Sequence, residues 1–227
     1  MVEENRDYPK GDGKTPRTLE PQGDDGERRF SPSVSRNRAI LREAFLDNVP
    51  ADAAVLEIGS GTGEHGIFIT ESEPDMSWTF SEFSQDAANG IQAWIDHANR
   101  AGLHGPFLLD ASSAEWGEGI EGQPFDVMFS ANVVHISPIS VLQGIMAGAG
   151  RLLSRGGRLV FYGPFARDGF MVESNQAFDA DLKRRNVEWG VRDLERDLLP
   201  LASGASLKLV ITAEMPKNNL FLVFERR

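Results

Sequence analysis

The stretch Ala54-Val-Leu-Glu-Ile-Gly-Ser-Gly-Thr-Gly63 decides the fold, because a short apolar run passes directly into a turn with three glycines. Four apolar residues among the first five are typical of a buried strand. Glycine accepts positive φ and lets a ligand approach the backbone closely. A helical pattern follows through His65–Thr70, and its N-terminus offers free N–H groups beside the turn. The sequence therefore predicts a strand, a glycine loop and a helix around a nucleotide-like ligand.

Strands and helices alternate along the rest of the chain. Strands are predicted at residues 54–58, 78–82, 106–110, 125–132, 158–162, 206–212 and 220–224. Further helices are predicted at residues 37–48, 86–100, 138–153 and 178–201. This alternation predicts an α/β fold of the Rossmann-like type, with a doubly wound, mainly parallel sheet of seven strands. The connector between the last two strands is too short for a crossover helix, so the last strand is expected to be antiparallel.

The overall composition predicts one globular domain. The chain has 227 residues, 41% of them hydrophobic, which suits a single domain at residues 30–227. Residues 1–29 are rich in Gly, Pro and charge and are expected to form a disordered N-terminal tail. The sequence has no cysteine, no long apolar run and no secretory signal. These absences favour a cytoplasmic protein over a membrane or secreted protein.

Charge and histidine spacing limit the candidate partners. The formal net charge of -11 disfavours binding to a phosphate backbone, so no nucleic-acid partner is expected. His65 and His97 lack further ligands at metal spacing, and no metal site is expected. The oligomeric state is left open by the sequence.

The glycine turn is compatible with two kinds of cofactor. Residues Gly61–Gly66 satisfy the G-x-G-x-x-G pattern of dinucleotide-binding proteins, which would make the chain an NAD(P)-dependent oxidoreductase. In that case the helix N-terminus would face a pyrophosphate, yet Glu57 and Glu64 bracket the turn with acids. S-adenosylmethionine carries a sulfonium and an ammonium group and no phosphate, so neighbouring carboxylates favour it.

Acidic residues also end the next two predicted strands. Glu82 is placed to accept hydrogen bonds from both ribose hydroxyls. Asp110 is placed to receive the adenine amino group, while a backbone N–H of Ala111 or its neighbour meets the ring. The predicted cofactor site consists of Arg36, Asn37, Glu57, Gly59, Ser60, Gly61, Gly63, Glu82, Asp110, Ala111 and Asn132.

These residues carry a resemblance. The run Leu56-Glu-Ile-Gly-Ser-Gly-Thr-Gly63, with Glu82 and Asp110 ending the next two strands, resembles class I S-adenosylmethionine-dependent methyltransferases. More narrowly, the chain resembles an uncharacterised "methyltransferase-like" family, a domain of unknown function, over about residues 30–227. The segments that carry this likeness are Ser31-Pro-Ser-Val-Ser-Arg-Asn-Arg38, Asn132-Val-Val-His-Ile-Ser-Pro138, Tyr162-Gly-Pro-Phe165 and Glu188-Trp-Gly-Val-Arg-Asp193. The resemblance implies methyl transfer from S-adenosylmethionine and does not identify the acceptor.

The acceptor is expected to be a small molecule bound beyond the fourth strand. Asn132 is placed to orient the acceptor or the methionine end of the cofactor, and His135, which titrates near neutrality when unperturbed, is a candidate base or a pocket-lining residue. Tyr162 is a candidate hydrogen-bond donor from a turn that covers the site. Arg36 and Asn37 are candidates to close over the cofactor carboxylate, although a helix cap near Ser35 also explains Asn37. A cofactor-binding module without turnover remains an alternative function.

Overall fold

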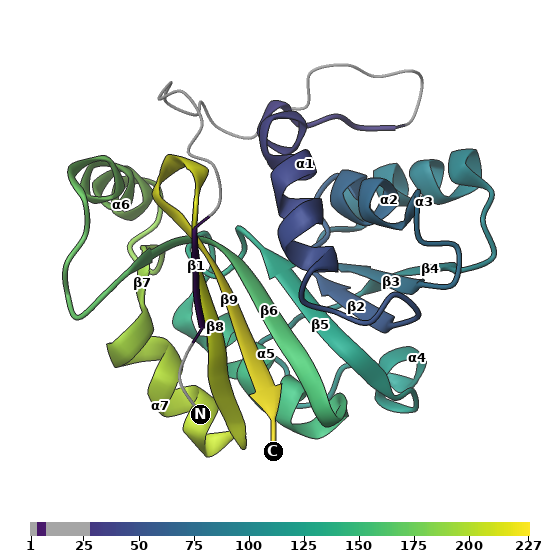
Figure 1. Ribbon diagram of the computed structural model, residues 1–227. Coiled ribbons are helices and arrows are strands. Elements are labelled where there is room, and N and C mark those ends of the chain that lie inside the picture. The colour runs from purple at the N-terminus through teal and green to yellow at the C-terminus, as the bar shows by residue number, and fades with distance from the viewer. Residues whose placement is uncertain (1–3, 8–27) are drawn as a thin grey trace.

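The computed structural model describes residues 4–7 and 28–227, and its main feature is one large twisted sheet (Figure 1). The strands are β1 (Glu4–Asp7), β2 (Ala54–Ile58), β3 (Ser77–Glu82), β4 (Leu103–Leu108), β5 (Phe125–Ala131), β6 (Leu153–Ala166), β7 (Arg192–Asp193), β8 (Leu207–Met215) and β9 (Asn219–Arg226). The helices are α1 (Pro32–Leu46), α2 (Glu64–Thr70), α3 (Gln85–Ala98), α4 (Glu118–Glu121), α5 (Ile139–Leu152), α6 (Glu173–Arg185), η1 (Leu194–Leu198), α7 (Leu199–Gly204) and η2 (Pro216–Asn218).

The strand order β1-β8-β9-β6-β5-β2-β3-β4 confirms the predicted fold class. Strands β2, β3, β4, β5 and β6 are parallel to one another. The last strand, β9, is antiparallel to both β6 and β8, between which it lies. All seven predicted strands are present, and two short strands join them, β1 beside β8 and β7 beside β6.

Helices cover both faces of the sheet, as a doubly wound fold requires (Figure 1). On one face, α1, α2 and α3 pack against side chains such as Val55 and Phe129. On the other face, α4, α5 and α7 pack against side chains such as Leu56 and Met128. Because successive side chains of a strand point to opposite faces, Glu57 shares the face of Val55, beneath α1 and α2. Residue alternation in β2 therefore sends one carboxyl group into an apolar core.

Two expectations about local structure are wrong in part. The predicted helix at 178–201 is interrupted, because α6 ends at Arg185 and the chain forms β7 before η1 begins. Asp193 explains the restart, since its side chain accepts hydrogen bonds from the backbone N–H groups of Glu195 and Arg196 and caps η1. The predicted turn at Tyr162 is instead the continuation of β6 to Ala166.

The predicted N-terminal tail at residues 1–29 lies mostly outside the described part of the chain. Glu4–Asp7 pair with β8 as strand β1, so these four residues are not without secondary structure. Arg28 and Arg29 also lie in the described structure, where the guanidinium of Arg29 bonds both carboxylate oxygens of Asp86 at 2.8 and 2.6 Å. The other residues of the predicted tail lie outside the described part of the chain, so the boundary at residue 30 stays a prediction.

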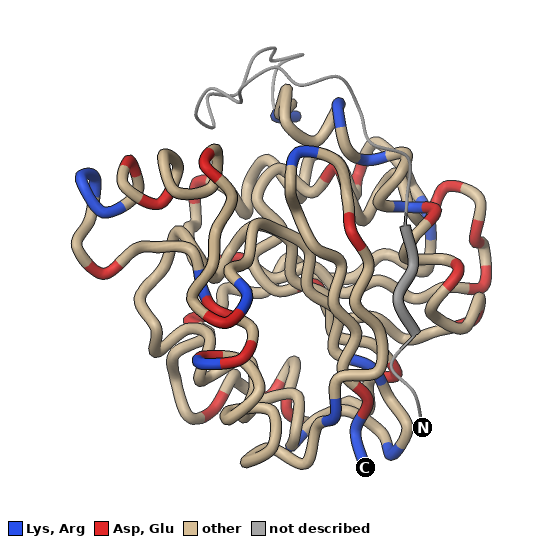
Figure 2. Tube along the Cα trace, turned by 60° about the vertical axis from the view of Figure 1, so that its left-hand side comes forward, with Lys and Arg blue, Asp and Glu red and all other residues tan. Residues whose placement is uncertain are grey.

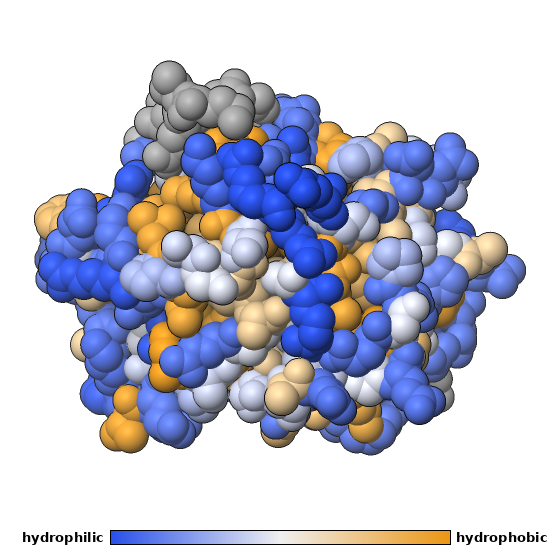
Figure 3. Space-filling view, turned by 90° about the horizontal axis from the view of Figure 1, so that it is seen from below, coloured by the Kyte–Doolittle hydropathy of each residue, from blue (hydrophilic) through white to orange (hydrophobic). Residues whose placement is uncertain are grey.

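The surface carries charge of both signs. Basic residues are interspersed with acidic ones along the described trace (Figure 2). The face at the amino ends of the parallel strands is mostly hydrophilic, with hydrophobic residues in small groups (Figure 3). Within residues 4–7 and 28–227, none of the helices combines the length and apolar composition needed to cross a bilayer.

Candidate functional site

The glycine loop lies at the carboxyl ends of the parallel strands, the edge at which open α/β sheets bind ligands. Gly59, Gly61 and Gly63 have φ values of +70°, +60° and +83°, which glycine adopts without strain. The loop is fixed to the neighbouring strand because the Ser60 N–H donates to the carbonyl of Ser81 at 2.9 Å. The backbone is thus held in a shape that the sequence pattern predicted.

The two outer glycines are closely packed, whereas Gly61 faces open space. A Cβ on Gly59 would lie 2.6 Å from Cγ2 of Val133, so the loop rests against the segment that follows β5. A Cβ on Gly63 would lie 3.3 Å from Ile91. A Cβ on Gly61 would meet nothing within 4 Å. The open side of the loop at Gly61 is therefore the place where a ligand can contact the backbone.

Glu57 lies behind the loop in an apolar environment. Its side chain is 1% exposed and accepts a hydrogen bond of 3.0 Å from the indole N–H of Trp78. Burial raises the pKa of Glu57 from 4.5 to about 8, although the hydrogen bonds from Trp78 and Ser60 act in the opposite direction. Glu57 is thus mostly uncharged at pH 7. The expectation that Glu57 places a negative charge beside the loop is therefore wrong.

Glu64 joins the loop to the segment that precedes α1. One carboxylate oxygen, Oε2, accepts hydrogen bonds from the Ser31 N–H at 2.5 Å and the Thr62 hydroxyl at 2.8 Å. Its other oxygen, Oε1, is buried without a partner among the described residues. Burial raises the pKa of Glu64. The carboxyl group therefore holds the start of α1 against the glycine loop.

Glu82 is the predicted residue most clearly brought to the loop. Its Oε2 accepts a hydrogen bond of 2.8 Å from the N–H of Gly61, and its Oε1 accepts one of 2.9 Å from the N–H of Phe83. A carboxylate can accept about four hydrogen bonds, so lone pairs remain for further donors. Phe83 itself is 75% exposed, which is unusual for an aromatic side chain. Sequence reasoning missed Phe83, although an aromatic residue directly after the strand-end acid was a visible signal.

Asp110 follows β4 at the same edge of the sheet. It is exposed, and its Oδ1 accepts hydrogen bonds from the N–H and the hydroxyl of Ser112 at 2.9 and 2.6 Å. A bond of 2.9 Å between the Leu109 N–H and the Glu82 carbonyl ties this segment to β3. Ala111 is buried, and its carbonyl lies against α5. Asp110 therefore neighbours the Glu82 strand, while the side chain of Ala111 faces away from solvent.

A partly buried polar network consists of Asn37, His65, Tyr162 and Asn219. His65 Nε2 lies 3.0 Å from Asn37 Oδ1, and the Asn219 amide donates to the Tyr162 hydroxyl at 3.0 Å. Asn37 also bonds to Tyr162, while burial raises the pKa of the phenol. The side chain of Asn37 is thus engaged with protein groups, and the suggested cap near Ser35 is wrong because α1 begins at Pro32. Arg36, one residue earlier, is exposed.

Asn132 and His135 converge on Gly163 of β6. A Cβ on Gly163 would lie 3.3 Å from Asn132 Oδ1 and 3.5 Å from His135 Nδ1. His135 is 3% exposed, and its Nδ1 has no partner among the described residues. Burial, together with the charge of Arg192, lowers the pKa of His135 to about 3. The expectation that His135 titrates near neutrality is therefore wrong, and its imidazole is neutral at physiological pH.

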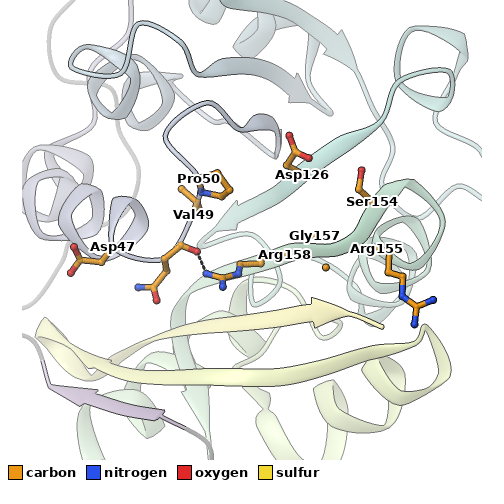
Figure 4. Close-up of a pocket in the computed structure, with 10 residues that line it drawn as sticks. Asp47, Val49, Pro50, Asp126, Ser154, Arg155, Gly157 and Arg158 are labelled. Carbon is orange, nitrogen blue, oxygen red and sulfur yellow. Dashed lines mark hydrogen bonds between the residues drawn. The ribbon is translucent and has the colours of Figure 1, made fainter. Parts of the chain in front are cut away.

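A separate hollow lies at the amino ends of the strands, away from these residues (Figure 4). Its volume is about 400 Å³, and its lining includes Asp47, Asp126, Arg155 and Arg158. Arg158 donates a hydrogen bond to the backbone carbonyl of Asn48. The side chain of Arg155 points away from this hydrogen bond (Figure 4). The hollow contains no predicted site residue. In the part of the chain that the structure describes, no three metal-ligating side chains are clustered.

Comparison of the sequence with known families gives one match over most of the chain. A sequence model of the family described as "Protein of unknown function (DUF938)" matches residues 28–226. A curated relative, the reducing polyketide synthase BOA6 of Botryotinia fuckeliana (strain B05.10), is 32% identical over 124 residues. That alignment covers 52% of this chain and 5% of the synthase, so the chain spans only a small part of that protein.

Solved structures share the fold. An O-methyltransferase family protein from Burkholderia thailandensis superposes with a TM-score of 0.71 at 13% identity, covering 86% of this chain and 57% of its own. CalO1, a methyltransferase in calicheamicin biosynthesis solved in an SAH-bound form, gives a TM-score of 0.65 at 15% identity, with coverages of 86% and 54%. This chain spans a little more than half the length of these two proteins. The fold is that of class I methyltransferases.

Proposed function

The chain belongs to the family described as "Protein of unknown function (DUF938)", and from its site we propose that it is an S-adenosylmethionine-dependent methyltransferase acting on a small molecule. The proposal rests on the carboxyl edge of the sheet, where the loop, the strand-end acids and an exposed aromatic ring meet. The class I fold is consistent with it, because two structures that share this fold are described as methyltransferases.

One observation carries the proposal: the Glu82 carboxylate binds the N–H of Gly61 beside the open side of the loop, and it also binds the N–H of the exposed Phe83. The loop leaves room for a ligand at Gly61, and the Glu82 carboxylate already lies 2.8 Å from the Gly61 nitrogen. A ribose seated there would donate its hydroxyls to the remaining lone pairs of Glu82. The exposed ring of Phe83 offers a face on which adenine stacks. These three groups fit an adenosine.

The acids around the loop favour a cationic rather than a diphosphate cofactor. Glu57 is uncharged near neutrality because it is buried, and an approaching ammonium group would favour its ionised form. A diphosphate at Gly61 would meet the carboxylate of Glu82 without a basic partner among the residues predicted for the loop. The sheet also departs from the all-parallel dinucleotide-binding order, since β9 is reversed between β6 and β8.

The residues beyond β5 would position the methyl acceptor. The cofactor supplies a methyl group on a sulfonium, which is ready for in-line displacement. Catalysis then requires alignment and exclusion of water more than acid or base strength. The amide of Asn132 would orient the acceptor or the methionine end of the cofactor, and the neutral imidazole of His135 would accept a hydrogen bond. Tyr162, held by two amides, would fix the floor of the site instead of covering it.

Thermal unfolding with added ligands tests the proposal. S-adenosylmethionine at about 100 times its Kd should add about 2.7 kcal/mol of stability, which raises the Tm by roughly 5–10 °C for a domain of this size. S-adenosylhomocysteine should also raise the Tm, whereas NAD and NADP should leave it unchanged. A shift with NAD and none with S-adenosylmethionine would reject the proposal in favour of an oxidoreductase.

Two variants and a turnover assay sharpen this test. Glu82→Ala removes the carboxylate beside Gly61 and should abolish the shift, while Glu43→Ala, at an exposed acid of α1, should retain it. Transfer of labelled methyl groups to a broad panel of small hydroxyl and amine compounds then separates an enzyme from a binding module. Cofactor binding without transfer to any compound of the panel would favour the module.

A further inference from the structure

Helix α6 (Glu173–Arg185) rests on the molecule with little apolar contact. Only three of its residues are buried, and two of these, Asn175 and Asp179, are polar. The third is Leu182. Burial of apolar surface is the main term that holds a helix against a domain, so a helix with one buried aliphatic side chain separates more easily than one packed by a full stripe. Among the helices beside the carboxyl edge, α6 is thus suited to move.

Hydrogen bonds fasten the start and the middle of α6. At its start, the Asn175 amide donates to the Asn218 carbonyl at 3.0 Å, and the Asn218 amide donates to the Ser174 hydroxyl at 2.9 Å. Asn218 lies at the tip of the β8–β9 hairpin, beside α6 and across from α1 (Figure 1). Beyond its end, the Val191 N–H donates to Asp179 Oδ1 at 2.8 Å. These are directional contacts that break and re-form without rearranging a core.

His135 lies directly beneath this helix. The ring of Phe178, on α6, packs against the His135 imidazole with centroids 5.5 Å apart. The Gly190 N–H, from the loop after α6, donates to the His135 carbonyl at 3.0 Å. The covered imidazole nitrogen Nδ1 has no hydrogen-bond partner among the described residues, and a buried polar atom left without a partner lowers the stability of the protein. A ligand that brings a donor to Nδ1 would remove this penalty.

The surroundings of Nδ1 select the chemistry of such a ligand. Asn132 Oδ1, a second acceptor, points to the same side of Gly163. The guanidinium of Arg192, which bonds to the carbonyls of Val134 and Ser137, places positive charge nearby and disfavours a cation. Two acceptors beside a positive charge favour an uncharged group with a hydroxyl or N–H.

We propose, on the basis of the proposed function, that α6 is a movable cover of the site that binds the methyl acceptor. In this site, His135 Nδ1 accepts a hydrogen bond from an uncharged methyl acceptor that bears a hydroxyl or N–H group. The acceptor enters when the contacts between α6 and the hairpin tip open. The helix then closes and excludes water from the methyl transfer, which takes place beside Asn132 and Gly163.

The absence of cysteine from the chain makes the cover testable without any known acceptor. The double variant Ser174→Cys/Asn218→Cys places thiols at two side chains that touch, and dibromobimane bridges them. Diethyl pyrocarbonate then modifies accessible histidines, and peptide mass spectrometry reports each one. His97 and His104 are exposed and give the reference rate, while His65, buried under α1, reports any general unfolding.

The rate of His135 modification should be at least about tenfold lower in the bridged protein than in the unbridged double variant. The rates at His97, His104 and His65 should not differ between the two forms. Equal rates at His135 in both forms, or no modification of His135 in either, would overturn the cover. S-adenosylmethionine should raise the Tm of both forms, and its failure to do so would count against the proposed function and not against the cover.

The same reagent tests the chemistry of the acceptor. In the unbridged variant, phenol should slow the modification of His135, whereas toluene, which has nearly the same shape without the hydroxyl, should not. The exposed histidines correct for any reagent consumed by phenol. Equal protection by both compounds, or protection by neither, would overturn the requirement for a donor at Nδ1.

Discussion

The side chain of Glu57 combines complete burial with hydrogen bonds from the indole of Trp78 and from Ser60. At the scale of residues, this environment has a consequence for stability. The pKa rises from 4.5 in the unfolded chain to about 8 in the folded protein, so the folded state binds the proton more tightly. The stabilisation is complete below pH 4.5 and declines as the pH rises towards 8, by about 1.4 kcal/mol per pH unit.

Glu57→Gln should therefore flatten the pH dependence of folding. The amide remains uncharged, so the variant should gain stability relative to the original chain at pH 8 and lose this advantage at pH 4.5. Urea unfolding at both values measures the difference. Asp75→Asn, at an exposed acid, serves as the matched control and should leave the dependence unaltered. A Glu57→Gln protein that follows the same pH profile as the original would mean that Glu57 ionises normally.

Gly61 gives a second test at the scale of residues. Gly61→Ala adds a methyl group to open space at a φ of +60°, so we expect a folding loss of about 1 kcal/mol from backbone strain alone. The methyl group would occupy the place proposed for the cofactor, and the affinity for S-adenosylmethionine should fall at least about tenfold. Calorimetric titration measures this affinity.

Gly156→Ala is the matched control for Gly61→Ala. Gly156 has a φ of +81° and open space around its Cβ position, but it lies in the hollow at the opposite edge of the sheet. It should lose similar stability and keep its affinity for the cofactor. If both variants bind S-adenosylmethionine like the original chain, the cofactor does not contact the loop at Gly61.

At the scale of elements, α2 depends on one close approach to the sheet. A Cβ on Gly66 would lie 2.3 Å from Trp78 Nε1 and 2.5 Å from Phe80. Gly66→Ala should therefore displace α2 and lower the free energy of unfolding by about 1–3 kcal/mol. Gly204→Ala, where the added methyl group meets nothing within 4 Å, should have little effect. Unfolding of both variants by urea decides the matter, and equal stabilities would show that α2 does not constrain Trp78.

The elements that the sequence predicted best are those with a strong local signal. Apolar runs bounded by glycine or proline located all seven long strands, and the short connector after β8 predicted the reversal of β9. The interruption after α6 was missed because the helical pattern resumes in η1, while the cap formed by Asp193 depends on local geometry. Strand β7 has two residues and owes its existence to pairing with β6, which no local pattern reveals.

The candidate site was predictable at strand ends and less so inside the fold. Chain order placed Glu82 and Asp110 at one edge, because parallel strands end together. The neutral states of Glu57 and His135 depend on burial by residues distant in sequence, such as Trp78 and Phe178. Periodicity can place a side chain on a face, but it does not show which acids lose their charge there.

At the scale of the whole molecule, the candidate site and every strand of the described sheet except β1 lie within residues 28–227. The family match begins at residue 28, and the loop, both strand-end acids and α6 follow it. A protein lacking residues 1–27 should therefore keep its affinity for S-adenosylmethionine within about twofold, with some loss of stability because β8 loses β1. Calorimetry and thermal unfolding measure the two quantities. A loss of cofactor binding would assign the removed segment to the site.

Open α/β sheets bind ligands at the carboxyl edge of the sheet, so the position of bound adenosine tests the proposed site most directly. A crystal structure with S-adenosylhomocysteine should show both ribose hydroxyls on the Glu82 carboxylate, adenine against Phe83, and the ligand backbone passing Gly61. Adenosine bound elsewhere, with Glu82 free of the ribose, would contradict the proposed site and the function built on it.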